Sequence, residues 1–370
     1  MPGGPDLDNP EFPRVSLMIM WAVTLDEDRR LGWSQVDDPL PGAGEVLVEV
    51  AATALNRADL MQVQGVYPPP PGASPILGME CSGTVAAVGD EVDSWSVGDE
   101  VCALLAGGGY AELVAVPAEQ VLPLPPGVDL VHGAALPEAT CTVWSNLVMV
   151  ARLQAGEVLL VHGGSSGIGT MAIQLGVALG ARVAVTASRD EALRACLALG
   201  AAVGINYATG DFVEELRAAT DGRGADVVLD VVGGKYLQRN IDALAERGRL
   251  VIIGMQGGRK AELDIAALMG KRASVHGTTL RSRAVRGPGS KAEVVQQVRD
   301  HVWPLIAAGT VQPVVESVLD IRDAQEAHER LAAGGHLGKI VLAVDPGSVW
   351  PDDGVDPAGI DSSGDDGEEQ

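Results

Sequence analysis

The sequence has 370 residues, 46% of them hydrophobic, and a formal net charge of −24. This length predicts two domains with substantial cores, and no apolar run reaches the roughly 18 residues that span a membrane. An acidic chain repels phosphate backbones, which argues against nucleic acid as a partner. The start lacks a basic segment followed by an apolar stretch, so we expect no secretory signal and a cytoplasmic location.

Both ends differ from the rest of the sequence. Residues 1–17 form a Pro- and Gly-bearing lead-in, and residues 345–370 hold nine acids with no lysine or arginine. Gly-, Ser- and Pro-rich acidic segments bury too little apolar surface to fold. We therefore predict a disordered lead-in and a disordered, solvated acidic tail.

The region from about residue 18 to residue 137 predicts short β-strands. EVLVEVAATAL (45–55), GMECSGTVAAVG (78–89) and YAELVAVP (110–117) alternate between apolar and other residues. Pro-Gly, Gly-Asp and Gly-Gly pairs separate these stretches, as turns require. The pattern indicates a compact β-rich unit, and the strand-like KIVLAV at 339–344 could pair back onto it.

The cysteines and histidines show no metal-binding pattern. Cys81, Cys102, Cys141 and Cys196 are scattered without a C-x-x-C pair, and the six histidines have no ligand spacing. We interpret the cysteines as buried free thiols and predict no metal site.

Strands and helices alternate from about residue 138 to residue 282. The predicted strands are Val158–His162, Arg182–Thr186, Val203–Asn206, Asp226–Val232, Leu250–Gly254 and Ser274–Thr279. The predicted helices include Thr170–Leu179, Asp190–Leu199 and Tyr236–Glu246, with Gly180, Gly200 and Gly248 at left-handed cap positions just past their ends. This alternation builds a doubly wound parallel sheet, and the fold class is α/β.

A glycine motif follows the first of these strands. Gly167-Ile168-Gly169-Thr170-Met171-Ala172, preceded by Ser165 and Ser166, fits the dinucleotide fingerprint G-x-G-x-x-A. Gly167 allows a sharp turn, Gly169 lets a pyrophosphate approach the backbone, and Ala172 allows close packing of helix on strand. The N–H groups of the first helical turn would face the anion. The alternative is a glycine-rich structural turn.

The residues after the second strand predict which dinucleotide binds. An NAD site typically has an acid there, which would repel the extra phosphate of NADP. This sequence has Ser188 and Arg189, whose hydroxyl and guanidinium can bind that phosphate. We therefore predict NADPH rather than NADH. Asp190 and Glu191 follow and suit the first turn of a helix, but they could also lie near the ribose and blur the preference.

Several stretches resemble one family. NRADLMQVQGVYPPPPGAS (56–74), ILGMECSGTV (76–85), LPEATCTVW (136–144), GGSSGIGTMAIQL (163–175) and TTLRSR (278–283) are similar to the quinone oxidoreductase branch of the medium-chain dehydrogenase/reductase superfamily. Within this branch the sequence most resembles the stress-inducible NADPH:quinone oxidoreductases. The resemblance runs from about Met20 to Val344.

This resemblance implies a domain organisation. It implies a GroES-like β-barrel catalytic domain over residues 18–137, completed by residues 283–344, and a Rossmann cofactor-binding domain over residues 138–282. The active site would be the cleft between them, and two chains would pair through their Rossmann domains as a homodimer. Zinc-dependent relatives carry a Cys where Asn56 stands and a His where Met79 stands, and neither Asn nor Met replaces those ligands. The resemblance thus also implies no metal.

Asn56 and Tyr67 are the candidate catalytic residues. An Asn and a Tyr at these places line the substrate cleft in the branch, and both side chains can donate a hydrogen bond to an acceptor oxygen. Each also has a structural alternative. Asn56 could cap the helix that follows, and Tyr67 could be a turn residue packed on Pro68–Pro71. Gly107–Gly109 either leave space for a flat ring or make a hairpin turn.

The resemblance implies further cofactor contacts. Thr142 matches a residue at the nicotinamide end, and Tyr207 matches a residue beside the adenosine phosphate. Other residues fall on stretches that line the cofactor in the family, namely Gly233, Gly254, Met255, Leu280 and Lys339. Relatives often carry a Lys where this sequence has Ala192, so Arg189 or Arg194 would supply the positive charge.

Together these observations predict a zinc-independent oxidoreductase. It would transfer hydride from NADPH to a quinone or a similar conjugated carbonyl, holding the rings in contact and stabilising the oxygen that becomes anionic. One alternative is a reductase of enones or enoyl thioesters. Another is a nucleotide-binding protein with little turnover.

Overall fold

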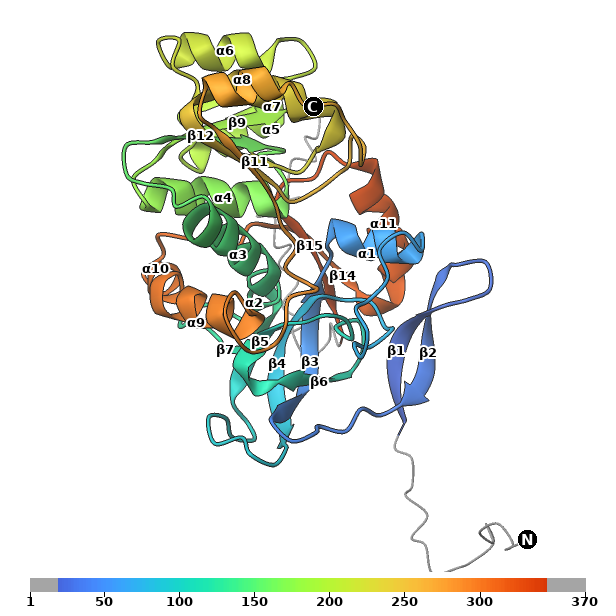
Figure 1. The fold of residues 1–370 in the computed structure, drawn as a ribbon. Helices are drawn as coiled ribbons and strands as arrows, with labels where there is room; N and C mark the ends of the chain where they lie inside the picture. Colours follow the sequence, from blue (N-terminus) through green and yellow to red (C-terminus); the bar gives the residue numbers. More distant parts are fainter. Residues whose placement is uncertain (1–18, 345–370) are drawn as a thin grey trace, which may run out of the picture.

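Two large sheets and a separate hairpin carry the fold in the computed structural model, which describes residues 19–344 (Figure 1). The predicted lead-in and the predicted acidic tail lie outside the described residues. None of the helices in this range combines the length and apolar character needed to cross a membrane.

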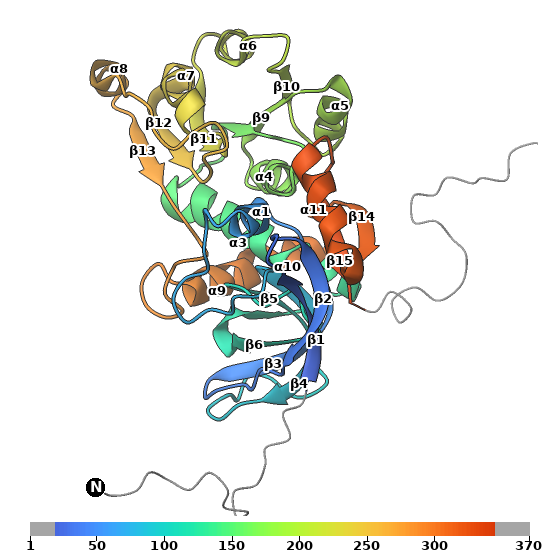
Figure 2. The same cartoon turned by 90° about the vertical axis from the view of Figure 1, so that its right-hand side faces the viewer.

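The first sheet is built from both ends of the described chain. Its strands are β3 (Glu45–Ala54), β4 (Glu80–Val88), β5 (Glu100–Leu104), β6 (Leu113–Pro117), β7 (Val121–Pro123), β14 (Val315–Asp320) and β15 (Lys339–Ala343). Their order is β14-β15-β3-β4-β5-β7, and β6 pairs with β3. Because β15 pairs antiparallel with β3, the predicted return of the C-terminal strand to the first unit is confirmed. The hairpin of β1 (Ile19–Leu25) and β2 (Leu31–Asp37) lies beside this sheet (Figure 2).

The second sheet is parallel throughout. Its strands are β8 (Val158–His162), β9 (Arg182–Ala187), β10 (Val203–Asn206), β11 (Ala225–Asp230), β12 (Leu244–Ile252) and β13 (Ser274–Gly277). They lie in the order β10-β9-β8-β11-β12-β13, which is the doubly wound order of dinucleotide-binding sheets. The helices around it are α4 (Gly167–Ala178), α5 (Asp190–Ala198), α6 (Phe212–Ala219), α7 (Leu237–Ala243) and α8 (Ile265–Gly270). The predicted fold class is confirmed.

The central strand β8 is apolar because both of its faces are covered. Leu159 and Val161 belong to one hydrophobic cluster with Ile173 of α4. Leu160 belongs to another cluster with Phe212 and Leu216 of α6. Burial on both faces explains the apolar run Val158–Val161, and the last residue of the strand, His162, is buried with hydrogen bonds to Thr186 and Asn240.

One predicted helix is wrong at its C-terminal end. The helix expected over Tyr236–Glu246 ends at Ala243, and β12 already begins at Leu244. Gly248 therefore lies inside a strand and is no helix cap. A Cβ at Gly248 would lie 2.9 Å from the Ala245 carbonyl oxygen, so the strand bends where only glycine fits. Gly180 and Gly200 do have left-handed φ values of 79° and 107°, as predicted.

Helices between the sheets hold the two sheets together. The sequence places α1 (Arg57–Val63), α2 (Leu130–Gly133) and α3 (Pro137–Trp144) before the parallel sheet, and α9 (Lys291–His301), α10 (Trp303–Ala307) and α11 (Ala324–Ala333) after it. One hydrophobic cluster contains Leu104 of β5, Val143 of α3 and Met171 of α4. The two sheets consequently share a core, and the groups between them are held in fixed positions.

The four cysteines confirm their predicted role. Cys81, Cys102, Cys141 and Cys196 are all buried and none forms a disulfide. Burial raises the pKa of each thiol, to about 11 for Cys196, so none is a reactive thiolate at neutral pH.

Candidate functional site

The glycine loop joins β8 to α4. Ser166 caps the helix, since its hydroxyl accepts a hydrogen bond from the Gly169 N–H at 3.0 Å and donates one to the Gly163 carbonyl at 2.8 Å. This cap starts α4 at Gly167, three residues before the predicted Thr170. A Cβ at Gly169 would overlap the carbonyl groups of Gly163 and Gly164. The loop thus needs glycine for its own close packing, besides any need to admit a pyrophosphate.

The last strand of the first sheet lies against this loop. The Gly338 N–H donates to the Ser165 carbonyl at 2.7 Å, and Ser166 and Gly338 form a short parallel bridge. A Cβ at Gly167 would overlap the aliphatic stem of Lys339. Gly167 therefore also allows β15 to approach, so residues from both sheets surround the point where the fingerprint predicts a pyrophosphate.

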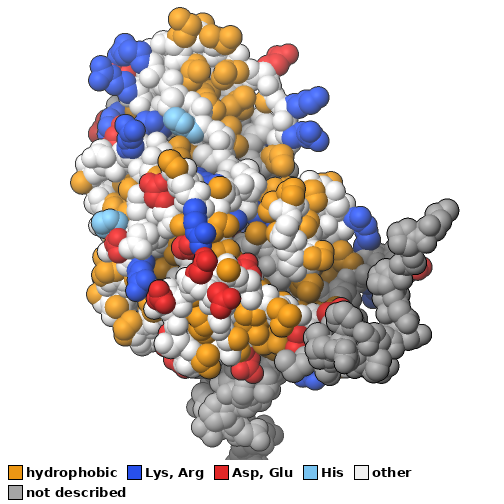
Figure 3. All heavy atoms as spheres, turned by 60° about the horizontal axis from the view of Figure 1, so that its bottom comes forward, with side chains coloured by type: hydrophobic (Ala, Val, Ile, Leu, Met, Phe, Trp, Pro, Cys, Tyr) orange, Lys and Arg blue, Asp and Glu red, His pale blue; other side chains and the backbone are white. Residues whose placement is uncertain are grey.

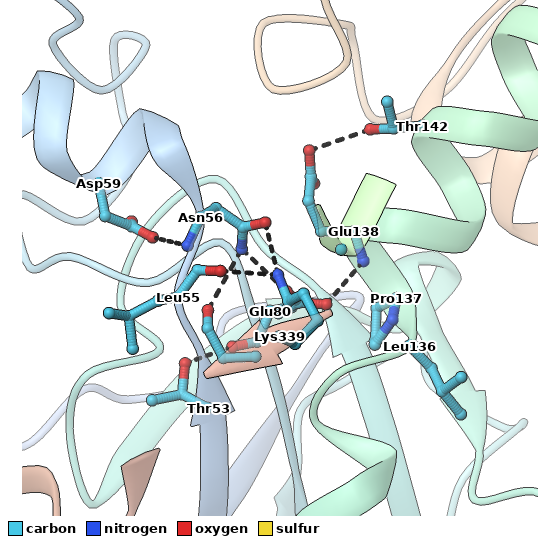
Figure 4. A network of polar contacts seen from close by, with 12 residues as sticks. Thr53, Leu55, Asn56, Asp59, Glu80, Leu136, Pro137, Glu138, Thr142 and Lys339 are labelled. Atoms are coloured by element: carbon cyan, nitrogen blue, oxygen red, sulfur yellow. Dashed lines mark hydrogen bonds and ion pairs between the residues drawn. The ribbon is translucent and has the colours of Figure 1, made fainter. Parts of the chain in front are cut away.

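Lys339 of β15 packs its aliphatic stem on the glycine loop and places its ammonium in a buried polar network (Figure 4). Its ammonium lies 2.7 Å from Glu80 Oε1, donates to Asn56 Oδ1 at 2.7 Å, and donates to the Leu55 carbonyl at 2.8 Å. The side chain is 6% exposed. Lys339 was expected to line the cofactor, and the structure places its stem against the loop and its charge on Glu80 and Asn56.

The amide of Asn56 is fully engaged inside the protein. Its Nδ2 donates to Glu80 Oε1 at 2.8 Å and to the Ala54 carbonyl at 3.2 Å, so both amide hydrogens are used. Asn56 is also the N-cap residue of α1, and its N–H donates to Asp59 Oδ2 at 2.8 Å. The capping alternative is confirmed, and Asn56 links α1 to Glu80 and Lys339.

Three buried acids surround this single ammonium. Glu80 Oε2 accepts a hydrogen bond from the Glu138 N–H at 2.9 Å, at the start of α3. Burial raises the pKa of Asp59 to about 6, although hydrogen bonds from the Asn56 and Gly78 N–H groups oppose the shift. Burial, followed by the charge of Glu80, raises the pKa of Glu138 to about 7. Asp59 and Glu138 therefore keep their protons to a higher pH than exposed carboxyl groups do.

Tyr67 lines a small cavity beside this network. The cavity measures about 70 Å³ and is formed by Tyr67, Pro68, Pro70, Arg281 and Ser282. The Arg281 guanidinium lies 5.5 Å from the centre of the Tyr67 ring. It also donates to Gln62 Oε1 at 2.6 Å and to the Ala106 carbonyl at 2.8 Å, next to the Gly107–Gly109 loop. Tyr67 thus lies beside Pro68 and Pro70 at this cavity, and its predicted contact with an acceptor stays a prediction.

Except for Thr142 in α3 and Lys339 in β15, the predicted cofactor residues line one edge of the parallel sheet. Each follows the carboxyl end of a strand: Ser165–Gly169 follow β8, Ser188 and Arg189 follow β9, Tyr207 follows β10, Gly233 follows β11, Gly254 and Met255 follow β12, and Leu280 follows β13. Ligands of doubly wound sheets bind at this edge. Residues far apart in the sequence are thereby brought together.

The adenosine end of this edge is half open. Ser188 and Arg189 are exposed, and the Arg189 guanidinium donates to the Gly335 carbonyl. Tyr207 is 43% exposed and its N–H donates to the Ala187 carbonyl at 3.1 Å, which places it next to Ser188. Asp190 accepts from Asn206 Nδ2 at 2.7 Å. Asp190 is therefore engaged with a neighbouring amide.

The opposite end is closely packed. Gly233 has a φ of 75°, and a Cβ there would lie 2.9 Å from the Gly254 carbonyl oxygen and 2.9 Å from Met255 Cα. Thr142 donates to Glu138 Oε1 at 3.1 Å, and Leu280 is buried. Thr142 thus connects the expected nicotinamide end of the edge to the acidic network.

Comparisons with known proteins agree with this architecture. A family model described as "Alcohol dehydrogenase GroES-like domain" matches residues 42–126, and one described as "Zinc-binding dehydrogenase" matches residues 167–300. A quinone oxidoreductase from Pseudomonas syringae pv. Tomato DC3000 is 30% identical, with a TM-score of 0.77 over 88% of this chain and 98% of that chain. The chain belongs to the medium-chain dehydrogenase/reductase superfamily.

Other proteins similar to this chain carry different names. Escherichia coli quinone oxidoreductase complexed with NADPH is 27% identical, with a TM-score of 0.78 over 88% of this chain and 100% of that chain. The CurK enoyl reductase is 28% identical, with a TM-score of 0.76 over 88% and 98%. The phthioceranic/hydroxyphthioceranic acid synthase of Mycobacterium tuberculosis is 38% identical over 157 residues. That match spans 42% of this chain and only 7% of the much longer synthase.

The polar network does not fit the zinc ion that the second family description names. Within residues 19–344, no group of three His, Cys, Asp or Glu side chains is arranged to hold a metal ion. The Lys339 ammonium lies against the oxygen atoms of Asn56 and Glu80 that face this space. A positive charge at that place repels a second cation.

The sequence did not indicate three residues of this site as functional candidates: Glu80, Glu138 and Arg281. All three lie in stretches that carried the family resemblance. Glu80 lies 24 positions from its partner Asn56 and 259 positions from its partner Lys339. Arg281 lies 219 positions from its partner Gln62. Only a signal that reports spatial contact would have found them.

Lys339→Met should destabilise the fold strongly. The variant leaves Glu80 as a buried carboxylate without its cation, and we expect a loss of about 3–5 kcal/mol in the free energy of unfolding, measured with urea. Lys339→Met/Glu80→Gln should recover much of this loss, because the unpaired charge is gone. The exposed Lys235→Met serves as the control. An equal loss in the single and the double variant would contradict the assignment of the ion pair.

Asp59→Asn should change how stability depends on pH. An unfolded aspartate titrates near pH ~3.9, whereas the folded carboxyl keeps its proton up to about pH 6. Between these values the folded state binds more protons, so wild-type stability falls as pH rises, by up to about 3 kcal/mol. In Asp59→Asn this contribution should disappear and the fall should become shallower, with the remainder due to groups such as Glu138, while the exposed control Asp28→Asn keeps the wild-type slope. Parallel curves for Asp59→Asn and wild type would refute the shift.

Proposed function

We propose that this dehydrogenase/reductase transfers hydride from NADPH to a quinone or a similar conjugated carbonyl without a metal ion. The observation that carries the proposal is the course of the sheet edge. It runs from Ser188 and Arg189, past the glycine loop, to Arg281, which follows β13 and lines the cavity with Tyr67. One end suits a nucleotide phosphate and the other suits a ring with an acceptor oxygen.

The chain's own residues would hold the cofactor in this way. The N–H groups at the start of α4 face the pyrophosphate, aided by the helix dipole. Ser188, Arg189 and Tyr207 offer two hydroxyls and a guanidinium to the phosphate on the adenosine ribose. NADPH supplies the hydride, and Thr142, Gly233, Gly254 and Met255 lie toward its nicotinamide end in this proposal.

The acceptor would enter the cavity of Tyr67 and Arg281. Pro68 and Pro70 give flat apolar walls, and the guanidinium and the phenol are the polar groups beside them. A positive charge and a hydroxyl donor stabilise an oxygen that becomes anionic during hydride transfer. Since Asn56 uses both amide hydrogens on protein atoms, we assign it the positioning of Glu80 and Lys339 rather than contact with the acceptor.

An enone or enoyl-thioester reductase is the second candidate. The similarity to the CurK enoyl reductase favours it, and the hydride step is the same. A basic cluster near the cleft would favour a coenzyme A thioester as the substrate. On the face drawn in Figure 3, the basic side chains of the barrel half are interspersed with acidic ones.

The proposed enzyme would be a cytoplasmic homodimer, as the family resemblance implies.

A panel of acceptors tests the proposed activity. Purified protein should oxidise NADPH with quinones such as 1,4-benzoquinone and 9,10-phenanthrenequinone, followed by the loss of nicotinamide absorbance. Turnover of enones or enoyl thioesters alone would favour the second candidate, and binding of NADPH without turnover would favour a nucleotide-binding protein.

Arg189→Ala tests the nucleotide preference. If Arg189 pairs with the adenosine phosphate, the variant should raise KM for NADPH about tenfold or more and KM for NADH by less than about twofold, since a charge-assisted hydrogen bond contributes about 1.5–3 kcal/mol. Arg182→Ala is the matched control, because Arg182 lies at the opposite end of the same strand. Equal effects of Arg189→Ala on both nucleotides would exclude the contact.

A further inference from the structure

Glu138 presents a carboxyl group that the proposed function has not used. Its N–H is fixed by Glu80, while its side chain turns away from Lys339 toward α3 and Thr142 (Figure 4). Oε1 accepts a hydrogen bond from the Thr142 hydroxyl at 3.1 Å. Oε2 is closed off from solvent and has no hydrogen-bond partner within residues 19–344. A buried carboxyl oxygen without a partner is costly, especially when it is ionised.

Burial and the charge of Glu80 favour the protonated form of Glu138. The titratable groups that face it come from several helices, strands and loops: Asp59 of α1, Glu80 of β4, Tyr67 before the proline turn, Cys141 of α3, Arg281 after β13, Lys291 of α9 and Lys339 of β15. Lys339 already pairs with Glu80, and Arg281 already bonds to Gln62. Burial and Glu80 together raise the pKa of Glu138 to about 7.

The reaction needs a proton at this place. Hydride transfer to a conjugated carbonyl leaves a negative charge on the acceptor oxygen, and a proton must follow. Tyr67 is a poor source, because burial raises the pKa of its phenol. Thr142 is the one side chain in the described residues that is hydrogen-bonded to the Glu138 carboxyl, and its threonine hydroxyl can pass a proton on.

We propose that Glu138 and Thr142 form a proton relay that serves the reduced acceptor. This inference rests on the proposed function. As the acceptor oxygen gains the hydride electrons, the Thr142 O–H bond breaks and its proton forms a bond with that oxygen. At the same time the Glu138 O–H bond breaks and its proton moves to Thr142 Oγ1; for this step the protonated Oε1 donates to Thr142, the reverse of the bond that it accepts when it is ionised. Glu138 is left as a carboxylate and regains a proton from solvent between turnovers, so it acts through Thr142 without touching the acceptor.

The protonated carboxyl can be observed without any cofactor. Infrared spectra of the free protein between pH 5 and 9 should show a carboxylic C=O component that disappears with a midpoint near pH 7, above the component of Asp59 near pH 6, and Glu138→Gln should remove the component near pH 7 alone. Thermal unfolding should show that Glu138→Gln folds, since the amide keeps the side-chain volume and the backbone bond to Glu80 remains. If the component near pH 7 is absent from wild type, or persists in Glu138→Gln, the relay is overturned.

Kinetics then separate the relay from the activity itself. In wild type, kcat with a quinone or enone should fall as pH rises through about 7, because Glu138 loses its proton. Glu138→Gln should lower kcat at pH 6.5 by about 10²-fold and remove this pH dependence, as loss of a proton donor does. Thr142→Val should give the same flat profile, and Thr142→Ser should restore the wild-type profile because it keeps a hydroxyl.

The outcomes of this experiment distinguish a failure of the relay from a failure of the proposed function. If wild type turns over the acceptors and both Glu138→Gln and Thr142→Val keep its pH profile, the relay fails while the proposed function stands. If wild type turns over none of the acceptors, the proposed function fails, whatever the infrared titration shows. A lower kcat in Glu138→Gln with an unchanged pH profile would assign Glu138 a structural role and also overturn the relay.

Discussion

The buried ammonium of Lys339 is the interaction on which the rest of the site depends. It bonds to Glu80 of β4, to Asn56 before α1 and to the Leu55 carbonyl at the end of β3, while its aliphatic stem rests on the glycine loop. A single side chain therefore connects the first sheet to the turn that starts α4. A buried charge tolerates little displacement, because losing a partner in a low-dielectric interior is costly. The two halves of the cleft are held in register for this reason.

This constraint also determines the chemistry of the cleft. Asp59, Glu80 and Glu138 lie near one ammonium, so the acids do not all carry charge at neutral pH. Glu80 takes the direct ion pair, and Asp59 and Glu138 hold protons to higher pH than usual. The network thereby occupies with its own cation the space that a metal ion would need. It also raises the pKa of the Glu138 carboxyl beside Thr142 to about 7, with burial as the larger cause.

The parallel sheet provides the other surface of the proposed site. Its strand order brings the loops after all six strands to one edge, so short polar segments form one continuous surface. Arg281 extends that surface into the first domain through Gln62 and the Ala106 carbonyl. The proposed nucleotide and acceptor sites thus lie on two sheets that share a hydrophobic core.

The sequence by itself determined the local features: the alternation of strands and helices, the glycine loop with its serine cap, the buried cysteines and the return of KIVLAV to β3. These follow from periodicity, turn residues and motif spacing, which act over a few residues. It misjudged the end of α7, because Gly248 lies against Leu244 and Ala245 inside β12 and is no helix cap. Only the tertiary structure decided that Asn56 bonds inward to Glu80, that Lys339 forms an ion pair with Glu80, and that Glu138 and Arg281 lie near this network. Burial and charge pairing arise between residues up to 259 positions apart, and no local pattern encodes them.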